Sequence, residues 1–308
     1  GDGTAAGAAI TANIATALTG PSGLVKTDLG TLRLTGANTY LGETRVLAGA
    51  LIQSGGTLGG TTAASALRVA VEIGATASLA VTNGAVLTST TASVATQTNS
   101  TGTVTVSGAG SRWNIVGQGR VAVGSFTLAN TRGLVEILDG GVLNFNADFS
   151  FAPFSVSGGS AVRVSGAGSR FDATAIMLFN QGGGGALTLE NGGVARAANF
   201  EFGETSALTI RSGARLETTV ASSLSFATGA TMLVTGTGSR INSAGALSFG
   251  GNSVRGGDLI IEDNAIVTSA ANTDSGLGFD SGRNMIVRSG GQFNLTGGTG
   301  AGLQMENS

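Results

Sequence analysis

The segment VTVSGAGSRWN, which begins at Val104, recurs as VRVSGAGSRFD from Val162 and as MLVTGTGSRIN from Met232. Each copy combines alternating apolar residues, a glycine-rich turn, an arginine and then a large apolar residue. Near copies at separate places in one chain indicate an array of one small unit that stacks on its neighbours. These three copies therefore decide the architecture.

Weaker copies of the same unit lie before, between and after these three. They share two apolar residues separated by one position and followed within a few residues by Gly or Asn, and their spacing averages about 26 residues. This period is typical of solenoids and other stacked arrays. The first apolar positions are Leu79, Val104, Val135, Val162, Leu187, Leu208, Met232, Leu259 and Met285.

A second set of apolar pairs, from Val121 and Val123 to Leu277 and Phe279, advances with the same period. Alternation of apolar and polar residues predicts strands, because successive side chains of a strand point to opposite faces. We expect the second members of six of these pairs to stack along one inner wall of the fold. These predicted stack residues are Phe151, Leu178, Phe202, Phe226, Phe249 and Phe279.

The composition agrees with a strand array. The 53 glycines among 308 residues disfavour helix, and a hydrophobic share of 41% with only 11% charged residues argues against disorder. The unit is shorter than a propeller blade and lacks the signatures of leucine-rich repeats and collagen. We predict an all-β, right-handed parallel β-helix (β-solenoid) of roughly eleven coils, with almost no helix.

Charged residues on the outside of this solenoid have equivalent places in consecutive coils. Glu190 and Arg211 should form one ion pair across coils, and Glu262 and Arg288 another. The 16 basic residues are scattered in a chain of net charge −2, so no basic stripe for nucleic acid is expected. The arginines of the three copies are interpreted as exposed turn residues, each followed by an inward apolar residue: Arg112 by Trp113, Arg170 by Phe171 and Arg240 by Ile241.

The segment LVKTDLGTLRLTGANTYLGETRVLAGAL, from Leu24 to Leu51, resembles the passenger-associated transport repeat of Gram-negative autotransporters, also called the autotransporter-associated β-strand repeat. That family's pattern runs roughly K-x-G-x-G-T-L-x-L-x-G-x-N-T-Y-x-G-x-T-x-V-x-x-G-x-L, and the segment departs from it at Asp28, where glycine is usual. The repeat residues carried over are Gly30, Thr31, Leu32, Asn38, Thr39, Tyr40, Gly42 and Gly49.

We divide the chain accordingly into three parts. Residues 1–22 are an N-terminal flank or partial coil, residues 23–56 hold the transport repeat, and residues 57–308 form the β-helix repeat array. The chain opens at Gly1 without a signal peptide and stops at Ser308 in mid-pattern. We therefore expect a fragment that is truncated at its C-terminus.

The resemblance implies a secreted β-helical passenger that a C-terminal β-barrel translocator carries through the outer membrane of a Gram-negative bacterium. Together with the repeat array and the absence of catalytic residue patterns, it leads us to expect a non-enzymatic surface stalk or adhesin scaffold that supports its own transport and folding. Its partner would be a host, matrix or neighbouring-cell surface. Self-association in cell aggregation or biofilm is an alternative, because the open ends of a β-helix present unpaired strand edges.

An enzyme is the other alternative. The chain has neither histidine nor cysteine, which excludes His-dependent triads and the usual zinc sites, and no cofactor or metal site is indicated. A polysaccharide-cleaving β-helix would have to use Asp and Glu. We interpret the candidate carboxylates as surface charge: Glu201 with Glu204, Asp258 with Glu262 and Asp263, and Asp274 with Asp280.

Overall fold

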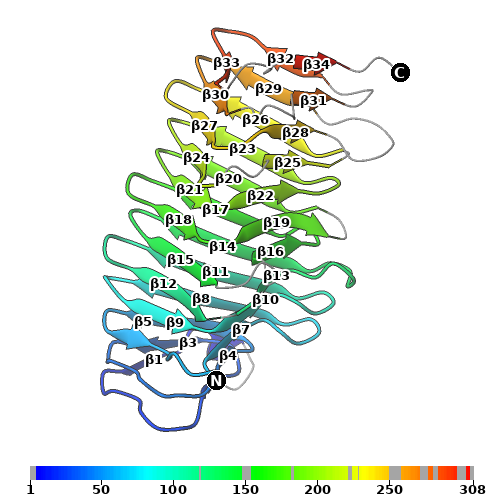
Figure 1. Ribbon diagram of the computed structural model, residues 1–308. Coiled ribbons are helices and arrows are strands. Elements are labelled where there is room, and N and C mark those ends of the chain that lie inside the picture. Colours follow the sequence, from blue (N-terminus) through cyan, green and yellow to red (C-terminus); the bar gives the residue numbers. More distant parts are fainter. Residues whose placement is uncertain are drawn as a thin grey trace.

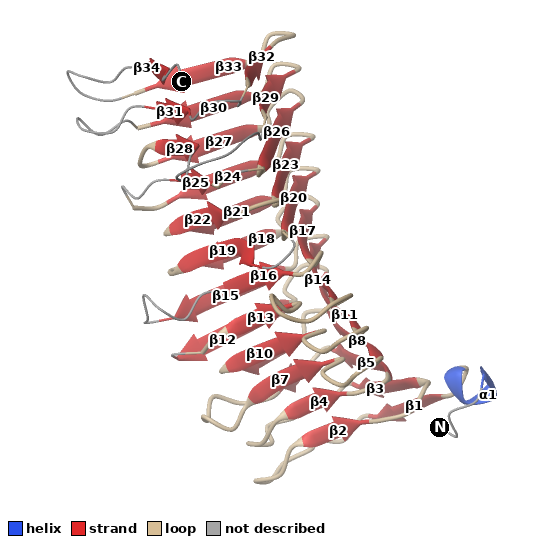
Figure 2. Cartoon of the chain, turned by 90° about the vertical axis from the view of Figure 1, so that its right-hand side faces the viewer, coloured by secondary structure: helices blue, strands red, loops and turns tan. Residues whose placement is uncertain are grey.

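The computed structural model describes residues 5–117, 119–147, 154–181, 184–220, 224–227, 229–249, 258–270, 277–279, 284–296 and 303–305. These residues form 34 strands and one short helix, α1 (Ala5–Ala8). The strands build three parallel sheets that run along one tall stack (Figure 1). Figure 2 shows the strands of successive coils lying one above another, with α1 beside the first strand at one end. The predicted parallel β-solenoid with almost no helix is confirmed, and the number of coils differs slightly from the predicted eleven.

The first sheet, called sheet A, has twelve strands and includes the first apolar positions of the repeat. Its strands are β1 (Thr11–Ile14), β3 (Thr31–Leu34), β5 (Gly49–Ser54), β8 (Thr76–Thr82), β11 (Thr101–Ser107), β14 (Arg132–Leu138), β17 (Ala161–Ser165), β20 (Ala186–Glu190), β23 (Ala207–Arg211), β26 (Thr231–Thr235), β29 (Leu259–Glu262) and β32 (Met285–Val287).

Sheet B also has twelve strands and includes the second apolar set. Its strands are β2 (Leu24–Lys26), β4 (Thr44–Val46), β7 (Ala66–Val69), β10 (Thr91–Val94), β13 (Val121–Val123), β16 (Phe154–Ser157), β19 (Ile176–Gln181), β22 (Asn199–Phe202), β25 (Leu224–Phe226), β28 (Leu247–Phe249), β31 (Leu277–Phe279) and β34 (Leu303–Met305).

Sheet C has ten strands and begins where the transport repeat ends. Its strands are β6 (Thr57–Leu58), β9 (Val86–Ser89), β12 (Arg112–Gly117), β15 (Val142–Ala147), β18 (Arg170–Ala173), β21 (Val194–Ala197), β24 (Arg215–Thr218), β27 (Arg240–Ser243), β30 (Ile266–Ser269) and β33 (Gln292–Leu295). From β5 onward each coil therefore runs through sheets A, C and B in turn.

The register of sheet A is the one predicted from the sequence. Leu79 pairs with Val104, Val104 with Val135, and each later member of the series pairs with the next, as far as Met285. The period of about 26 residues does not extend to the N-terminal end. There Thr31 pairs with Thr11 on one side and with Ala50 on the other, twenty and nineteen residues away. These coils are shorter because the chain passes between sheets A and B without a described sheet C strand.

Inward side chains of all three sheets meet in one continuous core. Buried and half-buried residues alternate along the strands, as in β11 and β14, so each strand contributes one face to the interior. A column of rings lies inside sheet B. Phe202 stacks on Phe179 with ring centres 5.0 Å apart and on Phe226 with centres 4.8 Å apart, and the planes are tilted by only 11° and 7°.

The predicted inner stack is wrong by one residue in one coil. Leu178 is half-buried on the outer face of β19, while its neighbour Phe179 is fully buried and pairs with Phe202. The segment from 176 to 179, IMLF, is apolar throughout and therefore fits either register, and a slip of one residue moves every side chain to the opposite face. The larger phenylalanine occupies the interior.

The other predicted stack positions have separate outcomes. Phe202 and Phe226 are buried in the column. Phe151 lies outside the described residues, and the strand that pairs at this level is β16, with Val156 opposite Val123 and Phe179. Phe249 and Phe279 continue the backbone register from Phe226, although their side chains lie outside the described part of the chain.

Candidate functional site

The transport repeat forms β2, β3, β4 and most of β5, and a buried amide pair ties its coils together. Asn38 Nδ2 donates to Gln53 Oε1 at 2.9 Å and to the carbonyl of Gly36 at 3.1 Å, and Asn38 Oδ1 accepts the Leu18 N–H at 2.9 Å. Gln53 Nε2 donates to the carbonyls of Gly36 and Gly55 at 3.0 and 2.7 Å. Both side chains are fully buried, so main-chain groups of three consecutive coils are satisfied internally.

Tyr40 fills the interior at the next turn. Its side chain is buried, and its hydroxyl lies 2.5 Å from Thr44 Oγ1. Burial raises the pKa of Tyr40 to about 12, although the hydrogen bond with Thr44 works in the opposite direction. The aromatic residue of the repeat is therefore a core residue with one satisfied polar group.

Lys26 holds the turn between β2 and β3. Its Nζ donates to the carbonyls of Thr27 and Asp28, both at 2.7 Å, and to that of Ala48 at 3.0 Å. Burial lowers the pKa of Lys26, and the charge of Asp28 offsets part of this shift. The three donors of the ammonium group thus meet three carbonyls at the edge of the core.

The glycines of the repeat occupy places where a side chain does not fit. Gly30 has a φ of +97°, and a Cβ there would lie 2.7 Å from the carbonyl oxygen of Gly7. Gly49 has a φ of +69°, and its Cβ would lie 2.7 Å from the oxygen of Asp28. These positions need a left-handed backbone and close approach of adjacent coils.

The remaining repeat residues differ in their exposure. Gly42 packs against the coil below, where an added Cβ would lie 2.7 Å from Gly23 Cα. Thr31 and Leu32 are half-buried in β3, and Leu32 packs against the core. Thr39 is exposed. Most residues of the signature therefore have structural roles, in the turns of the short coils, in the core or in contacts between adjacent coils.

The three conspicuous copies share a buried serine that sequence reasoning missed. Ser111, Ser169 and Ser239 are fully buried, and each Oγ accepts a main-chain N–H from the glycine turn of the preceding coil. The three N···Oγ distances are 3.1 Å from Gly84, 3.0 Å from Gly140 and 3.0 Å from Gly213. The signal in the sequence is the serine before the arginine in all three copies. Trp113, Phe171 and Ile241 are buried as predicted.

A carboxylate between two arginines lies at the C-terminal end of β20 in sheet A. Glu190 is 3% exposed and accepts hydrogen bonds from Arg163 Nε at 2.7 Å and from Arg211 Nε at 2.8 Å. Burial opposes its ionisation, but the hydrogen bonds and charges of Arg211 and Arg163 outweigh this, so the pKa of Glu190 lies below its usual value. Both predicted cross-coil pairs form, since Arg288 also lies 2.7 Å from Glu262.

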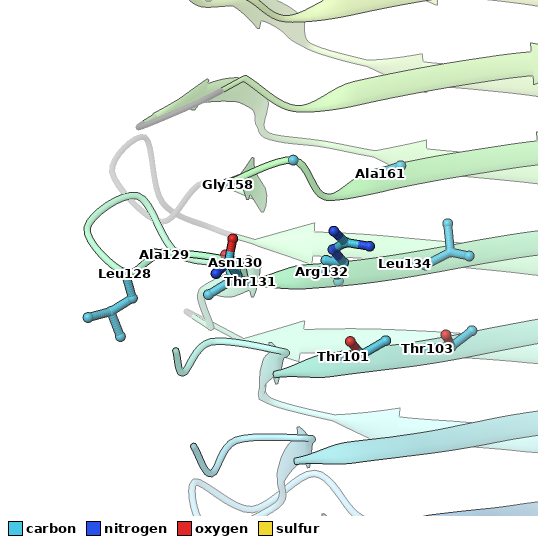
Figure 3. A pocket seen from close by; sticks show the side chains of 12 residues that line it. Thr101, Thr103, Leu128, Ala129, Asn130, Thr131, Arg132, Leu134, Gly158 and Ala161 are labelled. Atoms are coloured by element: carbon cyan, nitrogen blue, oxygen red, sulfur yellow. The ribbon is translucent and has the colours of Figure 1, made fainter. Parts of the chain in front are cut away.

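A shallow groove of about 710 Å³ lies at the N-terminal ends of strands β11 and β14 of sheet A, beside the loop before β14 (Figure 3). Thr101 and Thr103 of β11 line it below Arg132, and Leu128 and Asn130 project from the loop. The lining residues include one charged side chain, Arg132, and no carboxylate. The groove therefore lacks the paired carboxylates that glycan cleavage requires.

The candidate carboxylates have structural partners instead. Their described partners are Asn284 for Asp258, Arg288 for Glu262, Thr235 for Asp263 and Asn199 for Glu201. Burial raises the pKa of Glu201, while Glu204 is exposed in the following turn. Asp274 and Asp280 lie outside the described residues. Among the residues that the structure describes, no three acidic side chains come together in a way that could hold a metal ion.

Membrane-spanning helices are also absent from the described part of the chain, where no helix has the length and apolar character needed to cross a bilayer.

A family model described as the passenger-associated-transport-repeat matches residues 24–52. The chain is 57% identical over 51 residues to the adhesin BmaC autotransporter of Brucella suis biovar 1 (strain 1330), a match that covers 17% of this chain and 2% of that protein. The crystal structure of a TibC-catalyzed hyper-glycosylated TibA55-350 fragment matches over 93% of this chain and 98% of that one, at 16% identity and a TM-score of 0.26. Residues 24–52 thus match the passenger-associated transport repeat, and over a short part of its length the chain is similar to an autotransporter adhesin.

Proposed function

We propose that this chain is a non-enzymatic passenger segment of an autotransporter that acts as a surface stalk or adhesin scaffold and supports its own transport and folding. The observation that carries the proposal is the transport repeat built into the first coils of the solenoid. The adhesin relative supports the adhesive role, although the matched region is 2% of that protein's length. The full-length protein would carry a C-terminal translocator.

The physical basis is that each coil is completed by its neighbours. Asn38 joins groups of three consecutive coils, and Ser111, Ser169 and Ser239 each satisfy a turn in the coil before. A chain that leaves a pore end first can add one coil at a time, because contacts in a solenoid are between nearest neighbours. In the short N-terminal coils, Asn38 and Gln53 satisfy main-chain groups of the neighbouring coils.

The test uses the chain placed between a signal peptide and a translocator and measures the amount displayed on intact cells. Asn38→Ala removes the buried amide pair that Asn38 forms with Gln53, so we expect slower folding and reduced display. Thr39→Ala is the matched control, because Thr39 belongs to the same signature but is exposed. Equal loss in both variants would mean that the signature is recognised as a peptide sequence. Normal display of Asn38→Ala would remove the folding role.

The enzyme alternative receives no support from the described carboxylates. Glu262 is paired with Arg288, and Asp263 accepts a hydrogen bond from Thr235. We therefore propose binding rather than hydrolysis as the activity, with a host, matrix or neighbouring-cell surface as the partner. Release of reducing ends from acidic or neutral polysaccharides by the purified chain would contradict this.

A further inference from the structure

The outer face of sheet C carries a column of arginines immediately after the turn from sheet A. In each coil the first outward residue of the sheet C strand pairs with its equivalent in the next coil. We call these residues the arginine column; in order along the stack they are Val86, Arg112, Val142, Arg170, Val194, Arg215, Arg240 and Ile266. At about 4.8 Å per coil, the four arginines extend over about 24 Å. The stacked strands are visible in Figure 1.

A polar column runs beside it, two residues further along each strand. Arg196 adds a fifth guanidinium group, and Asn114 and Asn144 form a ladder in which Nδ2 of Asn144 donates to Oδ1 of Asn114 at 2.8 Å. The remaining members of this column are Thr88, Asp172, Glu217, Asn242, Thr268 and Asn294. The two columns together therefore hold five arginines and only two carboxylates, Asp172 and Glu217, in a chain whose net charge is −2.

These arginines are not explained by the stability of the fold. On sheet A, Arg163, Arg211 and Arg288 pair with carboxylates, whereas in the described part of sheet C the ion pair is that of Arg170 with Asp172 at 2.8 Å. Arg215 lies directly opposite Arg240 in the register, an arrangement that destabilises a sheet. Arg240 Nε is buried without a hydrogen-bond partner among the described residues.

We propose that this face of sheet C binds a linear acidic polysaccharide. Guanidinium groups bind carboxylate and sulfate groups through two parallel hydrogen bonds, so a straight column of arginines matches a straight polymer with repeated negative charges. The half-buried Val142 and Val194 offer apolar surface for sugar rings between the charges, and the amides of Asn114 and Asn144 can bond hydroxyl groups. The proposal deepens the adhesive role proposed above by naming a ligand class, and rests on it only for its biological setting.

Other polyanions fit this face less well. Single-stranded nucleic acid needs aromatic platforms on which bases stack, and the outward columns of sheet C contain no aromatic residue among the described positions. An anionic membrane would be favoured by exposed apolar side chains beside the charges. The exposed large apolar residues of the described chain lie elsewhere: Ile10, Val25, Leu29, Leu41, Ile73, Phe126, Val220 and Val287.

The experiment measures binding of heparin and of polygalacturonate to the purified 308-residue chain, with dextran as the neutral polymer. The test variant replaces Arg112, Arg215 and Arg240 by Gln. The matched control replaces Arg33, Arg120 and Arg132 by Gln; these arginines are exposed, lie outside sheet C and have no ion pair among the described residues. Both variants change the net charge equally, so they separate a local site from general electrostatics.

We expect at least one of the two polyanions to bind, with a strong dependence on salt, and the test variant to lose about tenfold or more in affinity. The control should stay within about twofold of the original chain. Equal losses in the two variants, equal binding of dextran, no binding of either polyanion, or tighter binding of a single-stranded oligonucleotide would each overturn the proposal. Surface display of the test variant should be normal, which keeps this result separate from the transport function.

Discussion

Replacing Phe202 by Ala tests the inner column of the solenoid. The ring is 1% exposed and lies nearly parallel to Phe179 and Phe226, with centres 5.0 and 4.8 Å away. Truncation of a buried phenylalanine costs about 3 to 5 kcal/mol, because the transfer free energy is lost and a cavity remains. For Phe202, which loses two ring stacks, we expect about 4 kcal/mol, the middle of that range.

The effect should be local rather than global. Coils of a solenoid contact mainly their neighbours, so the opening free energy should fall in β19, β22 and β25 and stay unchanged in β5 and β8. Hydrogen exchange followed by mass spectrometry measures this strand by strand. About 4 kcal/mol corresponds to roughly 1000-fold faster exchange for amides that exchange through opening of these coils.

Leu178→Ala is the control, because Leu178 is next to Phe179 in sequence but on the outer face of β19. We expect it to change the opening free energy by less than about 1 kcal/mol. Acceleration by Leu178→Ala equal to that by Phe202→Ala would refute the register of β19. Acceleration of every coil by Phe202→Ala would refute the nearest-neighbour account of stability.

Three further predictions concern individual polar groups: Tyr40, Glu190 and Ser169. Tyr40 is the single tyrosine, so its absorbance change on ionisation is unambiguous, and the midpoint should lie near pH 12 in the folded chain. Because the folded pKa is raised, this contribution to stability is complete below the unfolded pKa near 10 and is lost as the pH rises toward 12, by roughly 2 to 3 kcal/mol. Glu190→Gln should cost about 2 kcal/mol in urea unfolding at pH 7. Because the pKa of Glu190 is depressed, its contribution is present above the ordinary glutamate pKa, and the difference from the original chain should shrink in acid as the folded chain's carboxylate is protonated. Ser169→Ala leaves the Gly140 N–H without its acceptor and should cost about 1 to 2 kcal/mol, with faster exchange at that amide, whereas Ser169→Thr should recover part of the loss if the hydroxyl is what matters.

The sequence predicts sheet A better than sheet B because the two kinds of strand differ in pattern. Strands such as β11 alternate strictly and end in a glycine turn, so a single register buries their apolar residues. In β19 four apolar residues follow one another. In the coil of β16 the sequence offers two apolar pairs for the sheet B strand, Phe149 with Phe151 and Phe154 with Val156, and the second pair forms it. Without alternation, only packing against Phe202 and its neighbours decides which side chain faces inward.

The hydrogen bonds of the buried polar side chains cannot be predicted from the sequence, for another reason. The roles of Ser169 and Asn38 depend on which turn lies one coil below, and that turn is 29 residues from the serine but 20 residues from the asparagine. A repeat of constant period would have indicated these contacts directly. The change from two to three strands per coil near β6 removes the constant period, so the N-terminal coils looked like a separate motif rather than the start of the same stack.

The outer columns follow from the inner ones, and this explains why the arginines looked scattered. Arg215 belongs to the sequence SGARL, without the second glycine of the three copies, and lies beside Arg240 only because Leu216 and Ile241 share one inward register. A slip of one residue in β24 would bury the charge of Arg215 and expose Leu216. The inward apolar residues therefore decide which positions point outward, but not which residue types occupy them. Residues that occupy those positions at a cost to the sheet, as Arg215 and Arg240 do, are the ones for which binding is the better explanation.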